Sequence, residues 1–441
     1  MLGRIDPSRK NVTVVGAGIS GLLTAYYLDA RGYQVTLLEK SSEVGGLIQS
    51  HSLPTGLAES AAHSLLATPP VLELCEKLGV ELFSVQENSK ARFIFRDARM
   101  QKLPLKFLEI LGAIRRALFA RSTGQEITVQ DWALKHLGQA PATYLMTPML
   151  RGIYGASPAE ISLTAAFPKL QIPAGKTLLG YFVGNFIKAR ISILRGRSSS
   201  RARPRMMTPR GGMHEIVAAL ETSLQSTLQD RFKKGTEVQD LGTLLNSGTT
   251  VILCTPAQVA AQLIMGLDAA GAALARELRQ IPYSPMVSVT AHVPTAAFAE
   301  APHGVGVLMP PSTDRKCLGI LFNSSSFPQR VNTLDWQSFT LMLGGSQGEK
   351  WLAFSDEELS GVVRQELIEV LKMESQAEVK LKIFRWPRAI PLYSAELEKN
   401  WQRIEEGLPK GLVLCSNYTG QVSIRGILEN LHSRLEPASR S

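Results

Sequence analysis

Residues 16–21 read Gly16-Ala17-Gly18-Ile19-Ser20-Gly21 and stand between a strand-like run and a helix-like run. The β-branched residues of 11–15 predict a buried strand, residues 20–31 predict a helix that ends at Gly32, and 34–39 predict a second strand. This order is that of a βαβ unit with parallel strands. The first glycine permits a tight turn, the second lets a pyrophosphate approach the backbone, and the third lets helix and strand pack closely. Since a helix N-terminus favours anions, the segment predicts a dinucleotide site.

Glu39 ends the second predicted strand. A carboxylate at this position accepts hydrogen bonds from the two ribose hydroxyls of a dinucleotide and disfavours a 2′-phosphate. Lys40 follows it and is assigned to the same site. The alternative is a glycine-rich structural turn followed by a surface glutamate.

The length of the chain and its patterning predict several domains. A chain of 441 residues exceeds what one hydrophobic core supports, since such cores stop growing near ~250–300 residues. Helices are predicted over 106–119, 129–137 and 142–152, which together form a mainly helical insertion. Strand-like runs then alternate with one long helix, over 356–373, between residues 282 and 391.

Three sequence features bear on the compartment. The four cysteines are scattered without a Cys-x-x-Cys pair, so neither a metal site nor a disulfide framework is predicted, and a reducing compartment is favoured. The polar N-terminus lacks the pattern of a secretory signal. No apolar run reaches the ~20 residues that a membrane-spanning helix needs.

The net charge of +10 is concentrated in one segment. No acidic residue occurs between Glu160 and Glu215, whereas ten basic residues do, and they account for the whole excess. Within this segment, one apolar stripe flanked by basic residues is predicted for a helix; it consists of Leu178, Leu179, Phe182, Val183, Phe186, Ile187, Ile191 and Leu194. Such a helix can lie in an anionic membrane interface, and the alternative is a core-facing helix followed by a solvated basic loop. No nucleic-acid-binding module is recognised, so a nucleic-acid partner is not expected.

Several motifs carry a resemblance over nearly the whole chain. The doublet Gly45-Gly46 resembles the second glycine signature of FAD enzymes. Further motifs occur in order: ARFIF with LPL (91–95 and 103–105), RGIYGASPAEIS (151–162), PRGGM (209–213), GVLMPPS (306–312), LGILFNSSSFP (318–328), TLMLGGS (340–346), AIPLY (389–393) and YTGQVSI (418–424). With this order and spacing, the chain resembles the porphyrinogen-oxidising branch of the FAD-dependent amine oxidase superfamily.

The resemblance implies a fold and a domain arrangement. The expected class is α/β (α+β overall), with a Rossmann-like FAD-binding domain, a mixed-sheet substrate domain and an inserted helical domain. The FAD-binding domain is expected over 1–87, 206–262 and 408–441, the membrane-associating insertion over 88–205, and the substrate-binding domain over 263–407. A homodimer is compatible with the resemblance.

The resemblance also implies a reaction. The expected activity is FAD-dependent oxidation of protoporphyrinogen IX to protoporphyrin IX in haem biosynthesis, by hydride transfer to the flavin with dioxygen as acceptor. No catalytic residue beyond the flavin is expected, because the cofactor performs the chemistry. A cytoplasmic protein is expected, peripheral on the inner face of the cell membrane through the basic segment 176–210.

The resemblance also assigns site roles to individual positions of this chain. Arg92 matches an arginine that pairs with a substrate propionate, Gly152 a backbone carbonyl facing pyrrole N–H groups, and Leu308 and Met342 apolar pocket walls; plain core packing is the alternative for the last two. The cofactor-binding positions are Gly16, Ala17, Gly18, Ile19, Ser20, Gly21, Glu39, Lys40, Gly45, Gly46, Leu47, Ala61, Ala62, His63, Ser64, Val238, Asn417, Val422, Ser423 and Ile424.

Two departures from the family pattern concern the flavin surroundings. Ala61-Ala62-His63-Ser64 replaces a Gly-Pro-x-Gly/Ser loop, and Ser416 and Gln421 replace glycines. Side chains therefore occupy space where backbone approaches the flavin in the family. His63 is either a new polar contact to the flavin or substrate, or a tolerated replacement.

Other functions remain open at this point. Coproporphyrinogen III is an alternative substrate, and an amine or a polyene is the substrate of other superfamily members. A third hypothesis is a paralogue that binds porphyrin or FAD without turnover, which the altered 61–64 loop motivates.

Overall fold

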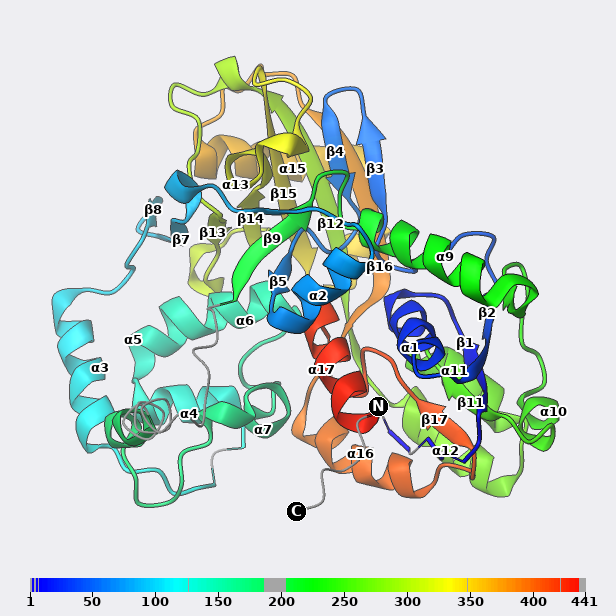
Figure 1. Ribbon diagram of the computed structural model, residues 1–441. Coiled ribbons are helices and arrows are strands. Elements are labelled where there is room, and N and C mark those ends of the chain that lie inside the picture. Colours follow the sequence, from blue (N-terminus) through cyan, green and yellow to red (C-terminus); the bar gives the residue numbers. More distant parts are fainter. Residues whose placement is uncertain are drawn as a thin grey trace, which may run out of the picture.

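The protein is described here by a computed structural model, in which residues 2–3, 5–6, 8–125, 127–185, 204–346, 348–420 and 422–435 are placed. Figure 1 shows a parallel sheet on the right, a mixed sheet above it and a group of helices on the left. Within the described residues no helix is both long and apolar enough to cross a membrane.

The parallel sheet joins segments that are far apart in the sequence. Its order in the described part of the chain is β10-β2-β1-β11-β17. Successive residues of a strand point to opposite faces, so Val14 belongs to one buried cluster and Val15 to another. Both faces are therefore covered, as in doubly wound sheets. The strands are β1 (Asn11–Val15), β2 (Gln34–Leu38), β10 (Phe232–Lys233), β11 (Thr250–Leu253) and β17 (Leu412–Leu414).

Helices cover the two faces of this sheet. α1 (Ile19–Asp29), α9 (His214–Leu228) and α17 (Ile424–Leu435) supply residues to one cluster. The opposite cluster takes residues from α11 (Ala257–Met265), α12 (Ala269–Arg279) and α16 (Ala395–Glu406). The short α10 (Leu241–Asn246) leads into β11, and α2 (Pro69–Lys77) packs against α17.

The mixed sheet has the order β16-β12-β15-β14-β13-β7-β8 among the described residues. All its pairs are antiparallel except β13 with β7. α14 (Lys350–Ala353) and α15 (Asp356–Leu371) contribute to the buried cluster on this sheet. Its strands are β7 (Arg92–Arg96), β8 (Arg99–Gln101), β12 (Tyr283–Pro294), β13 (Gly306–Leu308), β14 (Gly319–Phe322), β15 (Trp336–Gly344) and β16 (Lys380–Pro391).

Two small sheets connect these layers. β3 (Ser50–Leu53) and β4 (Gly56–Glu59) form a hairpin, and β9 (Arg205–Pro209) lies between β5 (Leu65–Ala67) and β6 (Leu82–Ser84). The four-residue α13 (Asn323–Ser326) follows β14. The fold class expected from the sequence, a Rossmann-like domain with a mixed-sheet domain and helices, is confirmed.

The left side of Figure 1 is helical. It contains α3 (Phe107–Phe119), α4 (Val129–His136), α5 (Gln139–Pro141), a π-helical turn at 142–146, α6 (Thr147–Tyr154), α7 (Leu163–Ala166) and a helix over 178–185. This part has a small buried cluster of its own, around Trp132, Leu150 and Ile161.

One boundary differs from the sequence expectation. The expected insertion begins at residue 88, yet β7 and β8 belong to the mixed sheet, because Arg92 and Ile94 pair with Gly306 and Leu308 on β13. The physical reason is that β14 covers only one edge of β13, and β7 pairs with the other edge, which would otherwise leave backbone groups without partners. The helices themselves begin at Phe107.

Candidate active site

Two adjoining cavities lie at the carboxyl ends of the parallel strands. One has a volume of about 570 Å³ and the other about 470 Å³. They share wall residues at Gly18, Gly46, Cys254 and Pro256. The first cavity lies over the ends of β1 and β2, and the second extends between the parallel sheet, the mixed sheet and α6.

The glycines of the fingerprint have distinct steric reasons. A Cβ at Gly21 would stand 1.8 Å from the carbonyl oxygen of Gly16, so only glycine fits. Gly16 has φ +99°, a backbone conformation that favours glycine. At Gly18 nothing lies within 4 Å of a Cβ position, and this open space belongs to both cavities. The backbone is therefore shaped to let a phosphate group approach the start of α1.

The doublet Gly45-Gly46 packs on the turn that contains the first glycine motif. The Gly45 amide donates to the carbonyl of Ala17 at 2.8 Å, and a Cβ at Gly46 would stand 3.4 Å from Gly18 Cα. Gly45 has φ +100° and Gly46 φ +60°. The two glycine motifs thus form one continuous wall at the junction of the cavities.

Glu39 stands at the larger cavity, as the sequence predicts. Its Oε2 accepts from the Ala17 amide at 2.6 Å and its Oε1 from the Ser41 amide at 2.9 Å. Lys40 and Val238 line the same cavity. A carboxylate fixed in this way at the end of β2 can receive ribose hydroxyls.

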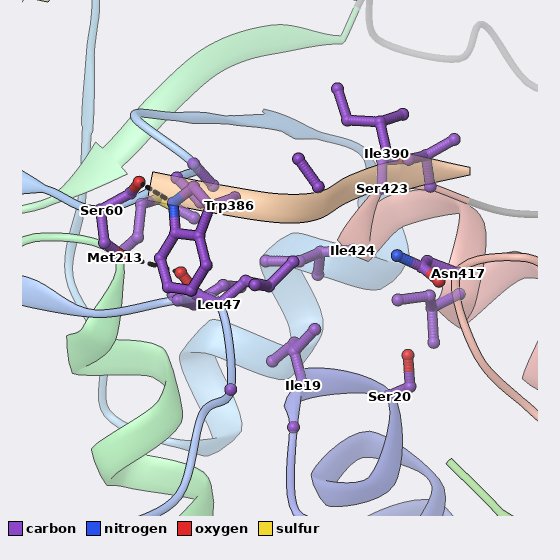
Figure 2. A pocket seen from close by; sticks show the side chains of 18 of the residues that line it. Ile19, Ser20, Leu47, Ser60, Met213, Trp386, Ile390, Asn417, Ser423 and Ile424 are labelled. Carbon is purple, nitrogen blue, oxygen red and sulfur yellow. Dashed lines mark hydrogen bonds between the residues drawn. The ribbon is translucent and has the colours of Figure 1, made fainter. Parts of the chain in front are cut away.

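The smaller cavity is mainly apolar and gathers residues from distant segments. Figure 2 shows Trp386, Ser60 and Met213 at one side and Ile390, Ser423, Ile424 and Asn417 at the other. The Trp386 indole Nε1 donates to the Ser60 carbonyl at 2.7 Å, which joins β16 to the loop after β4. The predicted residues in this wall are Gly18, Ile19, Ser20, Gly45, Gly46, Leu47, Ala61, Ala62, Ser64, Gly152, Met342, Asn417, Val422, Ser423 and Ile424.

Five predicted residues line neither cavity. Ala17 and Gly21 are buried in the turn, and Leu308 packs behind Gly152, where a Cβ would stand 2.8 Å from its Cδ2. Arg92 is exposed on β7. A substrate contact from Arg92 stays a prediction.

His63, the fifth, faces the mixed sheet. Its Nδ1 is 3.5 Å from Thr340 Oγ1, and its carbonyl accepts from Arg330 at 2.9 Å. Burial and the charge of Arg330 lower the pKa of His63 to about 3, so the ring is neutral at physiological pH. This placement favours a packing role over a direct flavin contact.

The other departures from the family pattern are Ser416 and Gln421. Ser416 lines the smaller cavity, and Gln421 lies outside the described residues.

A buried ion pair supports this wall from behind. Arg330 Nη1 is 2.6 Å from Glu59 Oε1, and both side chains are 3% exposed. Glu59 also accepts from the Met213 amide at 2.9 Å and from Ser50 Oγ at 2.6 Å. Burial raises the pKa of Glu59, and the neighbouring Arg330 opposes that rise. The pair fixes Ser60 and Met213, which line the cavity.

No described residue of the smaller cavity offers a base near neutral pH. Its described lining contains no Asp, Glu or His. Burial raises the pKa of Tyr283 to about 12 and raises that of Cys254 well above its usual range. Within the described lining, a redox reaction would therefore rely on a bound cofactor rather than on an acid or base side chain.

The sequence analysis missed a group of wall residues. They are Ser60, Met213, Tyr283, Met286, Ser288, Trp386, Arg388, Ile390 and Arg425. The AIPLY motif at 389–393 was a signal, since it begins inside this wall. Its neighbours Trp386 and Arg388 carry no motif that marks them.

The family described as flavin containing amine oxidoreductase matches residues 19–428. The chain belongs to this family. It is an FAD-dependent oxidoreductase, and the glycine wall with Glu39 fits the pyrophosphate and ribose of that cofactor.

Relatives within the family cover nearly the full chain. Protoporphyrinogen oxidase 2 (chloroplastic/mitochondrial) of Arabidopsis thaliana is 26% identical, over 95% of this chain and 91% of the relative. The Homo sapiens protoporphyrinogen oxidase is 28% identical, over 90% of each.

Solved structures share the fold. A provisionally named protoporphyrinogen oxidase from Exiguobacterium sp. 255-15 superposes with a TM-score of 0.73 at 17% identity, over 96% of this chain and 97% of the other. A UDP-galactopyranose mutase does so with a TM-score of 0.67 at 14% identity, over 96% and 93%. At these identities the likeness concerns the fold alone.

Proposed function

We propose that the protein oxidises protoporphyrinogen IX to protoporphyrin IX, with dioxygen as the electron acceptor. The supporting observation is an apolar cavity, free of carboxylate and imidazole side chains in its described lining, that adjoins the FAD-binding glycine wall. The similarity to protoporphyrinogen oxidases over 90–95% of the chain points to the same substrate.

The charge of the cavity argues against an amine substrate. Its charged lining residues are Arg388 and Arg425, among those the structure describes. A protonated amine would meet like charges there without a carboxylate to pair with. An anionic substrate with an apolar ring system avoids this conflict.

The cofactor and the cavity walls have different roles in this proposal. Bound FAD supplies the acceptor for the two electrons and the hydrogen that each oxidation step removes. Met342, Met286 and Ile390 form apolar walls that exclude water, and Gly152 on α6 lines the same cavity with Leu308 packed behind it. The Trp386–Ser60 hydrogen bond joins β16 to the loop after β4 in the wall of the cavity.

The test is anaerobic addition of protoporphyrinogen to the flavin-loaded enzyme. We expect the flavin absorbance to bleach, and porphyrin fluorescence to appear with about three peroxides per porphyrin after air is admitted, because six hydrogens leave in two-electron steps. Absence of bleaching would contradict the proposal.

The same assay separates the alternatives. Faster bleaching by coproporphyrinogen III would reassign the substrate within the porphyrinogens. Bleaching by an amine or a polyene alone would move the enzyme to another branch of the family. Porphyrin binding without bleaching by any substrate would indicate a non-catalytic paralogue.

We also propose that the helical part attaches the protein to the inner face of the cell membrane. α3 has no buried residue, and Phe107, Leu108 and Phe119 are more than 70% exposed. The helix over 178–185 exposes Leu179, Phe182 and Val183, whereas Leu178 packs on the local core. The remaining residues of the predicted stripe, from Phe186 onward, lie outside the described part of the chain. Exposed apolar groups beside basic residues favour an anionic lipid surface.

The membrane proposal predicts co-sedimentation with vesicles of anionic phospholipid. We expect binding to weaken at high salt, and to weaken further in Leu108→Asn with Phe119→Asn. Leu334→Asn is the matched control, since Leu334 is 80% exposed in the mixed-sheet domain. Equal sedimentation of the parent and the double variant would exclude α3 as the attachment surface.

A further inference from the structure

The apolar cavity carries positive side-chain charge and no negative charge in its described lining. Arg388 and Arg425 supply it. The phosphates of FAD belong at the glycine wall near Gly18, at the junction with the other cavity. Predicted FAD positions share this cavity, but neither Arg388 nor Arg425 is among them, so both are candidates for contact with a second ligand, one that is apolar over most of its surface and carries carboxylates.

Arg388 stands on an irregularity of β16. Ser284 pairs with Ile390 and Met286 with Trp386, so a step of two residues on β12 corresponds to a step of four on β16. Pro387 has no amide hydrogen for the ladder, and bulges beside active sites commonly re-aim a side chain. The Arg388 side chain is exposed, and it makes no hydrogen bond or ion pair with a described residue. Arg388 thus lines the cavity without a counter-ion among the residues that the structure describes.

Arg425 lies in the first turn of α17. Its Nε is 3.6 Å from Glu429 Oε1 one turn later, in a pair whose side chains are 39% and 53% exposed. Such exposed pairs are weak in water. The terminal nitrogens of Arg425 therefore remain available for a bidentate contact with a carboxylate.

The two arginines flank the same group of tyrosines. The charge of Arg388 acts on Tyr283, and that of Arg425 acts on Tyr154; in each case it opposes a pKa rise caused by burial. Tyr393 connects them, since its ring is 6.0 Å from that of Tyr154 and it interacts with Tyr283. Arg388 and Arg425 line the same cavity as Asn417 and as Gly152 and Ile153 of α6.

We propose that Arg388 and Arg425 bind the carboxylates of the substrate and so fix which edge of the ring system faces outward. The inference rests on the proposed function, because protoporphyrinogen carries two propionates on one edge of an otherwise apolar macrocycle. Both residues are specificity-determining groups that the sequence motifs do not mark. The exposed Arg92 lies outside both cavities and is not needed for this contact.

The test compares protoporphyrinogen with its dimethyl ester, which lacks the negative charges. For Arg388→Ala and Arg425→Ala we expect KM for the dicarboxylate to rise about five- to tenfold each, with kcat little changed, as for loss of a partly exposed charged hydrogen bond. KM for the ester should be the same in parent and variants. Arg388→Lys should recover part of the loss, because lysine keeps the charge without the bidentate fork.

Two controls accompany the kinetics. Arg276→Ala removes an exposed arginine from α12, outside both cavities, and should change neither KM. The bound-flavin absorbance spectrum of each variant should match that of the parent, which shows that the fold and the FAD site are intact.

The outcomes are distinguishable. No turnover of either compound by the parent enzyme overturns the proposed function and this inference with it. Turnover by the parent with an unchanged dicarboxylate-to-ester KM ratio in both variants overturns the inference alone. An equal KM rise for acid and ester also overturns it, because the arginines would then act through packing.

Discussion

At the scale of single residues, Gly21 is required because a side chain would clash with the backbone at the cofactor site. Gly21→Ala would place a methyl group 1.8 Å from the Gly16 carbonyl oxygen. We expect the turn before α1 to shift and the flavin-to-protein ratio of the purified protein to fall, since overpacking costs ~1–3 kcal/mol, which at ~1.4 kcal/mol per tenfold weakens flavin affinity ~5- to 150-fold. Absorbance of the purified protein measures this ratio.

Gly361→Ala is the matched control. Gly361 lies inside α15, and nothing stands within 4 Å of its Cβ position. Alanine there should leave flavin content unchanged and stabilise the helix by ~0.5–1 kcal/mol. Normal flavin content in Gly21→Ala would refute the steric argument.

The buried His63 makes the unfolding free energy of the enzyme depend on pH. The folded protein holds the pKa of His63 at about 3, below the ordinary value of 6.5. Below about pH 6.5 the unfolded chain therefore binds a proton that the folded chain does not, and stability falls as the pH falls toward about 3, by up to ~1.4 kcal/mol per pH unit. His292, with its pKa lowered to about 4, adds to this loss.

His63→Asn should reduce the dependence of the unfolding free energy on pH. Urea unfolding near pH 7 and near pH 5 measures the difference in unfolding free energy for parent and variant. The variant should lose less stability on acidification. An identical difference in both proteins would mean that His63 does not titrate on unfolding.

At the scale of elements, one ion pair connects the β7–β8 hairpin to α3. The Arg96 guanidinium contacts both oxygens of Glu109, at 2.9 and 3.0 Å, and stacks 3.7 Å from the Tyr144 ring centroid. Glu109→Gln should destabilise this junction by ~1–2 kcal/mol, because a bidentate charged contact to an almost buried arginine is lost. Limited proteolysis should then cut faster near α3.

The control removes an exposed ion pair. Lys90 and Glu87 pair at 2.8 Å, with Glu87 94% exposed, so Glu87→Gln should leave the cleavage rate unchanged. Equal cleavage rates in all three proteins would show that the Arg96–Glu109 pair does not hold α3.

At the scale of the whole molecule, the Arg330–Glu59 pair couples the two main domains. Arg330→Met should destabilise the flavin-loaded protein by ~3–5 kcal/mol, because Glu59 keeps a buried charge without a partner. The double variant Arg330→Met with Glu59→Gln should be more stable than Arg330→Met alone. Thermal unfolding of the three proteins tests this, and strictly additive losses would show that the two groups do not interact.

The sequence determined the class of fold and the cofactor end of the site. The βαβ order around 16–21 and Glu39 are local patterns, because strand, turn and helix N-terminus form from neighbouring residues. The larger cavity accordingly contains Gly16, Glu39 and Val238 as predicted. Motif order then identified the FAD-dependent family that the comparisons confirm.

The makeup of the apolar cavity was decided by tertiary structure. Trp386, Arg388, Met213 and Arg425 meet at one cavity only because β16, the start of α9 and α17 converge there. The assignment of β7 to the mixed sheet likewise depends on an edge that β13 presents some 200 residues later, as the Arg92–Gly306 pairing shows. Contacts of such long range leave no local periodicity in the chain, and so no single segment predicts them.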